Sequence, residues 1–121
     1  MFNIYKRDIG SVEPTEYLPA SAGLPLGTAA KLTGGSLSKA SGAEVPTHIV
    51  LGSARADGRV PALRVQSTTV FETTSTAAVT AVGGTVQLYT DGQQVTAAAG
   101  GPFTVEYTEN KAGGIVRGRF L

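Results

Sequence analysis

The chain contains no cysteine and no tryptophan, and its single histidine is His48. Without thiols it cannot use a cysteine nucleophile, form a disulfide, or hold zinc or an iron–sulfur cluster through thiolates. One histidine also excludes a metal site built from several histidines of the same chain. These absences remove most metal and thiol chemistry from consideration.

Charge is also scarce in this sequence. Charged residues make up 16% of the chain, the net charge is +1, and the basic residues are scattered. Proteins that bind nucleic acid carry a basic stripe, so we expect no nucleic-acid partner. No apolar run reaches the roughly 20 residues of a membrane-spanning helix, and the charged residues among the first ten argue against a signal peptide. We therefore expect no membrane association.

Turn-forming residues are abundant, with 16 glycines and 6 prolines among 121 residues. They separate short extended segments, and the length suggests a single domain. The clearest hairpin joins residues 85–90 to 93–96 through Asp91-Gly92, a pair typical of a two-residue type I′ turn. In that register Leu88 lies opposite Val95, and both side chains point to the same face.

A second hairpin is predicted earlier in the chain. Residues 30–33 and 36–39 flank Gly34-Gly35, which would place Leu32 opposite Leu37. Ala and Lys in this stretch would also suit a helix, but two adjacent glycines in its middle argue against one.

Further β-branched and alternating segments complete an all-β pattern. The Ala-rich stretch 75–82 is the one candidate for a short helix, although its valines and threonines make it a poor one. We predict a small antiparallel β-sandwich or barrel with at most one short helix. The additional predicted strands are 47–51, 59–74 (as two strands or one bent strand), 103–108 and 115–121.

Residues 1–25 differ from the rest because they contain Pro14, Pro19 and Pro25. Proline at this spacing disfavours a long helix or a central strand. We therefore interpret 1–25 as an extended N-terminal arm and 26–121 as the β domain. The arm would cover a sheet edge of its own domain or reach a neighbouring chain.

No pattern in the sequence predicts catalysis. His48 could pair with Asp57 or Glu72 as a general base, but no nucleophile motif accompanies it, and we favour a strand histidine at a surface or interface. The glycine pairs lack the Lys-Ser or Lys-Thr of a phosphate loop. We expect a protein that is not an enzyme and that has no cofactor.

The last predicted strand carries Arg117 and Arg119, two residues apart and therefore on one face. Two interpretations remain open. These arginines either pair with an acidic neighbouring chain or belong to a solvated sheet face.

Four stretches, in order, resemble the capsid decoration proteins (also called cement or head-stabilising proteins) of tailed bacteriophages and prophages. Together they cover most of residues 27–120, whereas the first 25 residues are not part of the resemblance. The stretches are GTAAKLTGGSLSKASGAEVPTHIVLG (27–52), GRVPALRVQSTTVFET (58–73), TDGQQVTA (90–97) and AGGIVRGRF (112–120).

The resemblance implies a structural virion protein, made in the bacterial host cytoplasm and located on the outer face of the capsid. Such proteins stabilise contacts between major capsid subunits, often as trimers, so the implied partners are the phage major capsid protein and two further copies of the chain. The last strand, and the apolar and aromatic composition of the arm, nominate the interface residues. These are Phe2, Ile4, Tyr5, Arg7, Tyr17, Arg117 and Arg119.

Other functions are compatible with the same sequence. The chain could be another virion component, such as a head fibre base or a tail protein. It could also be a carbohydrate-binding β module for a surface glycan, in which Tyr5, Tyr17, Tyr89 and Tyr107 would offer stacking platforms. A hydrolase built on His48 is the alternative with the least support.

Overall fold

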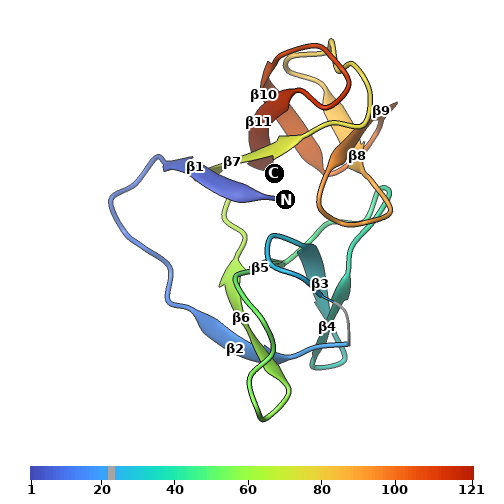
Figure 1. Cartoon of the computed structure of the whole chain (residues 1–121). Coiled ribbons are helices and arrows are strands. Elements are labelled where there is room, and N and C mark those ends of the chain that lie inside the picture. Colours follow the sequence, from blue (N-terminus) through green and yellow to red (C-terminus); the bar gives the residue numbers. More distant parts are fainter. Residues whose placement is uncertain (22–23) are drawn as a thin grey trace.

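A computed structural model of the chain describes residues 1–21 and 24–121, which contain eleven β-strands and no helix. Six strands form one antiparallel sheet in the order β1-β7-β11-β10-β8-β9, and five form another in the order β2-β6-β5-β3-β4. Figure 1 shows the six-stranded sheet above the five-stranded one. The all-β antiparallel prediction is therefore confirmed. The strands are β1 (Asn3–Arg7), β2 (Glu16–Pro19), β3 (Ala29–Thr33), β4 (Ser36–Lys39), β5 (His48–Val50), β6 (Arg59–Arg64), β7 (Thr69–Thr74), β8 (Thr85–Leu88), β9 (Val95–Ala99), β10 (Phe103–Thr108) and β11 (Ile115–Phe120).

Both predicted hairpins form, but one of them has a different turn. Leu32 faces Leu37 in β3–β4, and Leu88 faces Val95 in β8–β9, as expected. In the second hairpin Gly92 has a positive φ of 68° and Asp91 does not, which excludes a type I′ turn. Instead, the Asp91 carboxylate accepts the backbone N–H of Gln93 at 2.8 Å. A hydrogen bond to the Asp91 side chain therefore stabilises this turn, which does not adopt the predicted type I′ backbone conformation.

The stretch 59–74 divides into two strands that belong to different sheets, β6 in the five-stranded sheet and β7 in the six-stranded one. The helix candidate at 75–82 forms no helix. Val79 is buried there, and its carbonyl oxygen accepts the Thr108 hydroxyl at 2.8 Å. Tertiary contacts thus hold this segment in an irregular conformation.

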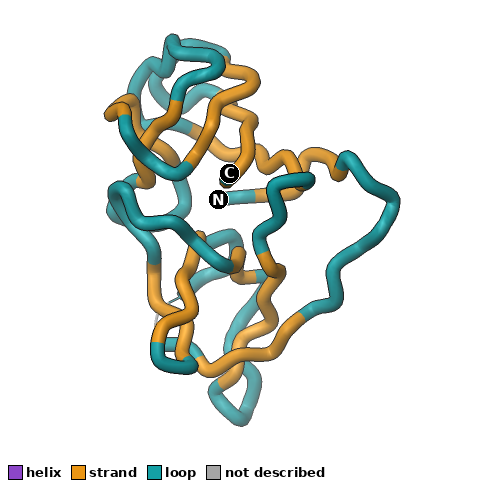
Figure 2. Tube along the Cα trace, turned by 180° about the vertical axis from the view of Figure 1, so that it is seen from behind, coloured by secondary structure: helices purple, strands orange, loops and turns teal. Residues whose placement is uncertain are grey.

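The structure does not show an extended N-terminal arm. β1 pairs with β7 at the edge of the six-stranded sheet, and β2 pairs with β6 at the edge of the five-stranded sheet. In the view from behind, a long loop joins the two strands (Figure 2). The prolines are compatible with this because an edge strand can leave N–H positions unpaired, and Pro19 stands at the end of β2. Of the two interpretations of the arm, the structure supports the one in which this segment covers sheet edges of its own chain.

Two apolar clusters fill the molecule. The larger one includes Ile49 of β5, whereas the adjacent Val50 belongs to the smaller one, because neighbouring strand residues point to opposite faces. All five strands of the second sheet contribute to the smaller cluster. A bridge between Ala20 and Leu37 joins the β2 and β4 sides of that sheet, so the sheet curls around this cluster.

Phe2 is a core residue rather than a surface residue, which corrects its nomination as an interface residue. Its side chain is 3% exposed, and its ring lies 5.8 Å from that of Phe103 and 5.5 Å from that of Phe120. Phe71 completes the group, so all four phenylalanines of the chain meet in one aromatic cluster. The N-terminal segment is therefore tied to the core at its second residue.

We predict that Phe2→Ala lowers the free energy of unfolding by about 3–5 kcal/mol, because it empties a ring-sized volume inside the aromatic cluster. Ile4→Ala is the matched control on the same segment, and it should cost about 1 kcal/mol because Ile4 is partly exposed. Chemical denaturation of the three proteins measures both values. Equal losses for the two variants would contradict the placement of Phe2 in the core.

Candidate interaction face

Strand β11 separates its side chains cleanly between two faces. Val116, Gly118 and Phe120 are buried, whereas Arg117 and Arg119 point to the outer face of the sheet. Gly118 is required by the close approach of β10, since a Cβ at this position would lie 2.0 Å from the Thr104 carbonyl oxygen. Gly118 thus allows β10 to approach β11 closely. Arg117 and Arg119, on either side of Gly118, project their guanidinium groups outward.

Arg117 lies between two tyrosine rings. Its guanidinium carbon is 4.0 Å from the centroid of the Tyr5 ring and 4.6 Å from that of Tyr107. Its Nε donates to Glu72 Oε2 at 2.7 Å, and this hydrogen bond is the main cause that raises the pKa of Arg117. The Arg117 side chain is therefore held by cation–π contacts with Tyr5 of β1 and Tyr107 of β10 and by an ion pair with Glu72 of β7.

Two strand irregularities accompany the tyrosines. The β1–β7 register shifts between Ile4 and Lys6, and the β10–β11 register shifts between Val105 and Tyr107. A β-bulge turns side chains away from the regular alternation of a strand. The bulges thus occur where Tyr5 and Tyr107 approach Arg117 from opposite sides.

Arg119 is paired with carboxylates from two other segments. It forms ion pairs with Asp8 and Glu106, and its Nη1 also donates to the Ser67 carbonyl oxygen at 3.1 Å. The hydrogen bond from Arg119 lowers the pKa of Asp8, and the two carboxylates raise the pKa of Arg119. We call the set Tyr5, Asp8, Glu72, Glu106, Tyr107, Arg117 and Arg119 the Arg–Tyr face.

A further ion pair lies beside this face and holds the loop between β1 and β2. Arg7 Nε donates to Glu13 Oε2 at 3.0 Å, and the Thr69 hydroxyl donates to Glu13 Oε1 at 3.1 Å. Partial burial raises the pKa of Glu13, but the hydrogen bonds from Arg7, from its own backbone and from Thr69 outweigh it and lower the pKa. The loop is thus fastened near its start by Asp8 and near its end by Glu13.

The structure brings together only part of the nominated interface. Tyr5, Arg117 and Arg119 belong to the Arg–Tyr face, with Arg7 beside it. Ile4 lies on the same strand, opposite Phe71. Tyr17 is on β2 of the other sheet, where the Arg55 guanidinium carbon lies 4.7 Å from its ring centroid.

Sequence reasoning missed the carboxylates that complete the face. Nothing in the local spacing of Asp8, Glu72 and Glu106 links them to the arginines. Arg119 is 111 positions from Asp8, and Arg117 is 45 positions from Glu72. Only strand pairing brings them together, although the predicted strand 103–108 already included Tyr107.

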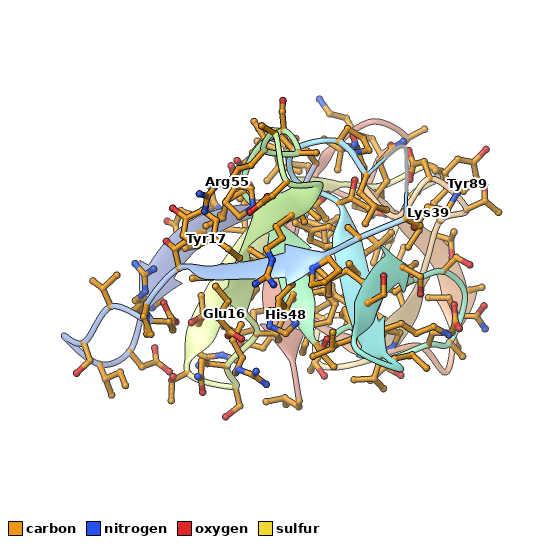
Figure 3. All side chains as sticks on the ribbon, turned by 90° about the horizontal axis from the view of Figure 1, so that it is seen from below. Glu16, Tyr17, Lys39, His48, Arg55 and Tyr89 are labelled. Carbon is orange, nitrogen blue, oxygen red and sulfur yellow. The ribbon has the colours of Figure 1, made fainter. Side chains whose placement is uncertain are left out.

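His48 occupies a separate polar cluster inside the five-stranded sheet. It is fully buried, with Nε2 3.3 Å from Glu16 Oε2 and Nδ1 2.8 Å from the Thr47 hydroxyl oxygen. Arg64 donates to both oxygens of Glu16 at 3.0 Å, and this is the main cause that lowers the Glu16 pKa. Figure 3 shows Glu16 beside His48. Neither Asp57 nor Glu72 is the partner, and His48 is an interior strand residue instead of a surface one.

Within residues 1–21 and 24–121, no group of three or more His, Asp or Glu side chains is placed to hold a metal ion. The same residues include no helix long and apolar enough to cross a membrane. No family model, curated protein or solved structure matches the chain.

We predict that Arg119→Gln raises the pKa of the Asp8 carboxyl toward its ordinary value of 3.8, because the substitution removes the cation that favours the ionised form. Because the pKa of Asp8 is lowered in the folded state, its stabilising pairing is present above pH 3.8 and is lost as the pH falls through the lowered value. A carboxyl-detected NMR titration measures the shift.

Arg117→Gln is the matched control for this titration, since Arg117 pairs with Glu72 and not with Asp8. It should leave the Asp8 pKa unchanged. An Asp8 pKa that moves equally in both variants, or in neither, would show that Arg119 is not the specific partner of Asp8.

Proposed function

We propose that the chain is a structural virion protein that binds the outer surface of an assembled phage capsid and stabilises contacts between major capsid subunits as a homotrimer. The partner is the major capsid protein, and the Arg–Tyr face is the surface that meets it. The resemblance of residues 27–120 to decoration proteins supplies the class of function. The composition and geometry of the Arg–Tyr face support the assignment of the binding surface to this part of the molecule.

The composition of this face suits protein recognition. Tyrosine and arginine are enriched among residues that dominate binding energy, and here both tyrosines remain accessible at the surface. Arg117 and Arg119 are already held by carboxylates, so they lose little conformational freedom on binding. Strands rather than mobile loops supply most of the face, which favours a contact with defined geometry.

Charge balance on the face indicates how the capsid is recognised. Two arginines and three carboxylates (Asp8, Glu72 and Glu106) give a net charge of −1. Because each arginine is paired internally, a strongly acidic partner is not required. We therefore expect recognition through shape and aromatic contact, with weak dependence on salt.

Stabilisation of the lattice follows from multivalency. A trimer would contact several capsid subunits at once, so its avidity would exceed the affinity of one copy. If the contacting surfaces are aligned only in the expanded lattice, binding shifts the equilibrium toward that lattice by mass action. This mechanism needs no catalytic group and no cofactor.

A carbohydrate-binding function is the second candidate, because all four tyrosines are exposed. The stacked guanidinium of Arg117 occupies one side of the Tyr5 and Tyr107 rings, and Arg55 does the same at Tyr17. Tyr89 alone has no such cation over its ring among the described residues. A sugar that stacks on the same side would therefore compete with an internal contact at three of the four rings.

We predict that the purified chain co-sediments with capsids assembled without it and saturates at many copies per particle. Tyr107→Ala should weaken this binding by about tenfold or more, because it removes one of the two exposed aromatic rings of the face. Tyr89→Ala is the matched control, since Tyr89 is 41% exposed and Tyr107 is 43% exposed, but Tyr89 lies outside the face. Its occupancy should equal that of the unmodified chain.

Absence of binding to intact capsids would overturn the proposed function. Binding confined to one vertex or to the tail would instead assign the chain to a head fibre base or a tail. Binding on a glycan array without capsid binding would favour the carbohydrate-binding module. Equal losses for the two tyrosine variants would place the contact elsewhere on the molecule.

A further inference from the structure

Residues 8–19 form a strap that leaves the end of β1 in the six-stranded sheet and includes β2 of the five-stranded one. In the view from behind, its first part follows the margin of the molecule (Figure 2). All of these residues are described, and none of their side chains is buried. Glu13, Glu16 and Leu18 are half-buried, and the others are exposed. Apolar burial therefore contributes little to the attachment of the strap.

Two carboxylates attach the first part of the strap to the six-stranded sheet. Asp8 pairs with Arg119 of β11, whose Nη2 donates to Asp8 Oδ1 at 3.2 Å. Glu13 pairs with Arg7 of β1 at 2.9 Å and accepts the Thr69 hydroxyl of β7 at 3.1 Å. Contacts between charged groups thus fix this part of the strap on three strands.

A third carboxylate attaches the second part of the strap to the five-stranded sheet. Arg64 of β6 donates from Nε and Nη2 to the two oxygens of Glu16, each at 3.0 Å. On β5, the buried His48 has its Nε2 3.3 Å from Glu16 Oε2, and Figure 3 shows the two side chains together. The backbone of β2 pairs with β6 over only four residues, and Leu18 packs against the smaller apolar cluster. The side chain of Glu16 therefore links β2 to two strands.

We infer that the strap is released in acid, so that β2 leaves the edge of β6 while the rest of the two sheets stays folded. Protonation removes the negative charge that each of the three arginines binds, and all three attachments weaken together. The sheets are held instead by two buried apolar clusters, whose burial does not depend on pH. A segment with few buried apolar contacts opens at a lower free energy than the core.

The pKa of each carboxyl group sets the direction of this pH dependence. A hydrogen bond from an arginine is the main cause that lowers the pKa of Asp8 and of Glu16. In Glu13 partial burial raises the pKa, but several hydrogen bonds outweigh it and the pKa is lowered. Each attachment is therefore complete above the ordinary pKa, 3.8 for Asp8 and 4.5 for the glutamates, and is lost as the pH falls through the lowered value.

Further charged or titratable side chains face these carboxylates from neighbouring strands. Lys6 lowers the pKa of Asp8 and His48 lowers that of Glu16, because a positive charge favours the ionised carboxylate. Glu106 shares the guanidinium of Arg119 with Asp8. The further side chains are thus Lys6 of β1, His48 of β5 and Glu106 of β10.

Release of the strap exposes the edge of β6 and the apolar side chains that Leu18 covers. Unpaired N–H and C=O groups at a sheet edge are a template for a strand of another chain. At neutral pH the strap protects this edge, and in acid the same edge becomes a surface for strand pairing. Capsid binding plays no part in this release, so the purified chain alone is sufficient to test it.

Hydrogen exchange followed by NMR measures the release directly. A pH series from about 6.5 down to about 2 gives the protection of the β2 amides and of the β7 amides, after correction for the intrinsic effect of pH on exchange. We expect the protection of β2 to fall by about tenfold or more in acid, and that of β7 to change by less than about twofold.

Glu16→Gln tests the attachment at neutral pH, because it removes the charge and keeps the size of the side chain. It should lower the protection of β2 by about fivefold or more without acid. Arg64→Gln should do the same from the other partner, and since Arg64 is 51% exposed this variant remains informative if Glu16→Gln does not fold. Glu44→Gln is the matched control, because Glu44 forms an exposed ion pair with Lys31 in the same sheet and should leave β2 unchanged.

Three results would overturn the inference. The protection of β2 could stay constant over the pH series, or β2 and β7 could lose protection together, which would show that the strap opens only when the whole chain unfolds. Glu44→Gln could also expose β2 as strongly as Glu16→Gln and Arg64→Gln, which would show that any lost ion pair in this sheet has the same effect.

Discussion

The aromatic cluster around Phe2 is the contact on which the rest of the structure depends. Its ring packs against Phe103 and Phe120, and its backbone N–H donates to the Gly27 carbonyl oxygen at 2.9 Å. These contacts fix the start of β1, and the pairing of β1 with β7 then carries Tyr5 to Arg117. Asp8 at the end of that segment reaches Arg119. One buried ring near the N-terminus thus sets the position of the outer face and of the loop that follows it.

The Arg–Tyr face is also a structural element in its own right. Each arginine links strands that are not neighbours in the sequence, and each replaces contact with water by contact with aromatic rings or carboxylates. Exposed ion pairs contribute little to stability individually, so their main effect here is to restrict side-chain conformation. In the proposed function, a partner would meet a surface whose charges are already paired and whose rings are already oriented. This arrangement favours selectivity by shape over attraction by charge.

The sequence predicted those features of the fold that depend on residues close together in the chain, such as hairpins and strand alternation. Gly34-Gly35 and the alternation around it gave the β3–β4 pairing, including Leu32 opposite Leu37. The predicted type I′ turn at Asp91-Gly92 was wrong, because the Asp91 carboxylate accepts the backbone N–H of Gln93 and stabilises a different turn. The N-terminal prolines argue against a long helix or a central strand, and this segment instead forms edge strands, which tolerate proline. Of the candidate face, the sequence placed Arg117 and Arg119 on one side of a strand, nominated Tyr5 and included Tyr107 in a predicted strand. The contacts between these residues were not accessible, because they come from pairings between distant segments.

The distribution of sheet edges bears on how copies of the chain could meet. β2 and β4, at the two sides of the five-stranded sheet, are joined by the Ala20–Leu37 bridge. In the six-stranded sheet β1 is interrupted by its bulge next to Lys6, and both features discourage pairing with another strand. β9 pairs irregularly with β8. Neither edge of that sheet is a regular template for a strand of a second copy. If copies of the chain associate, their contact is therefore directed to side-chain surfaces rather than to strand pairing.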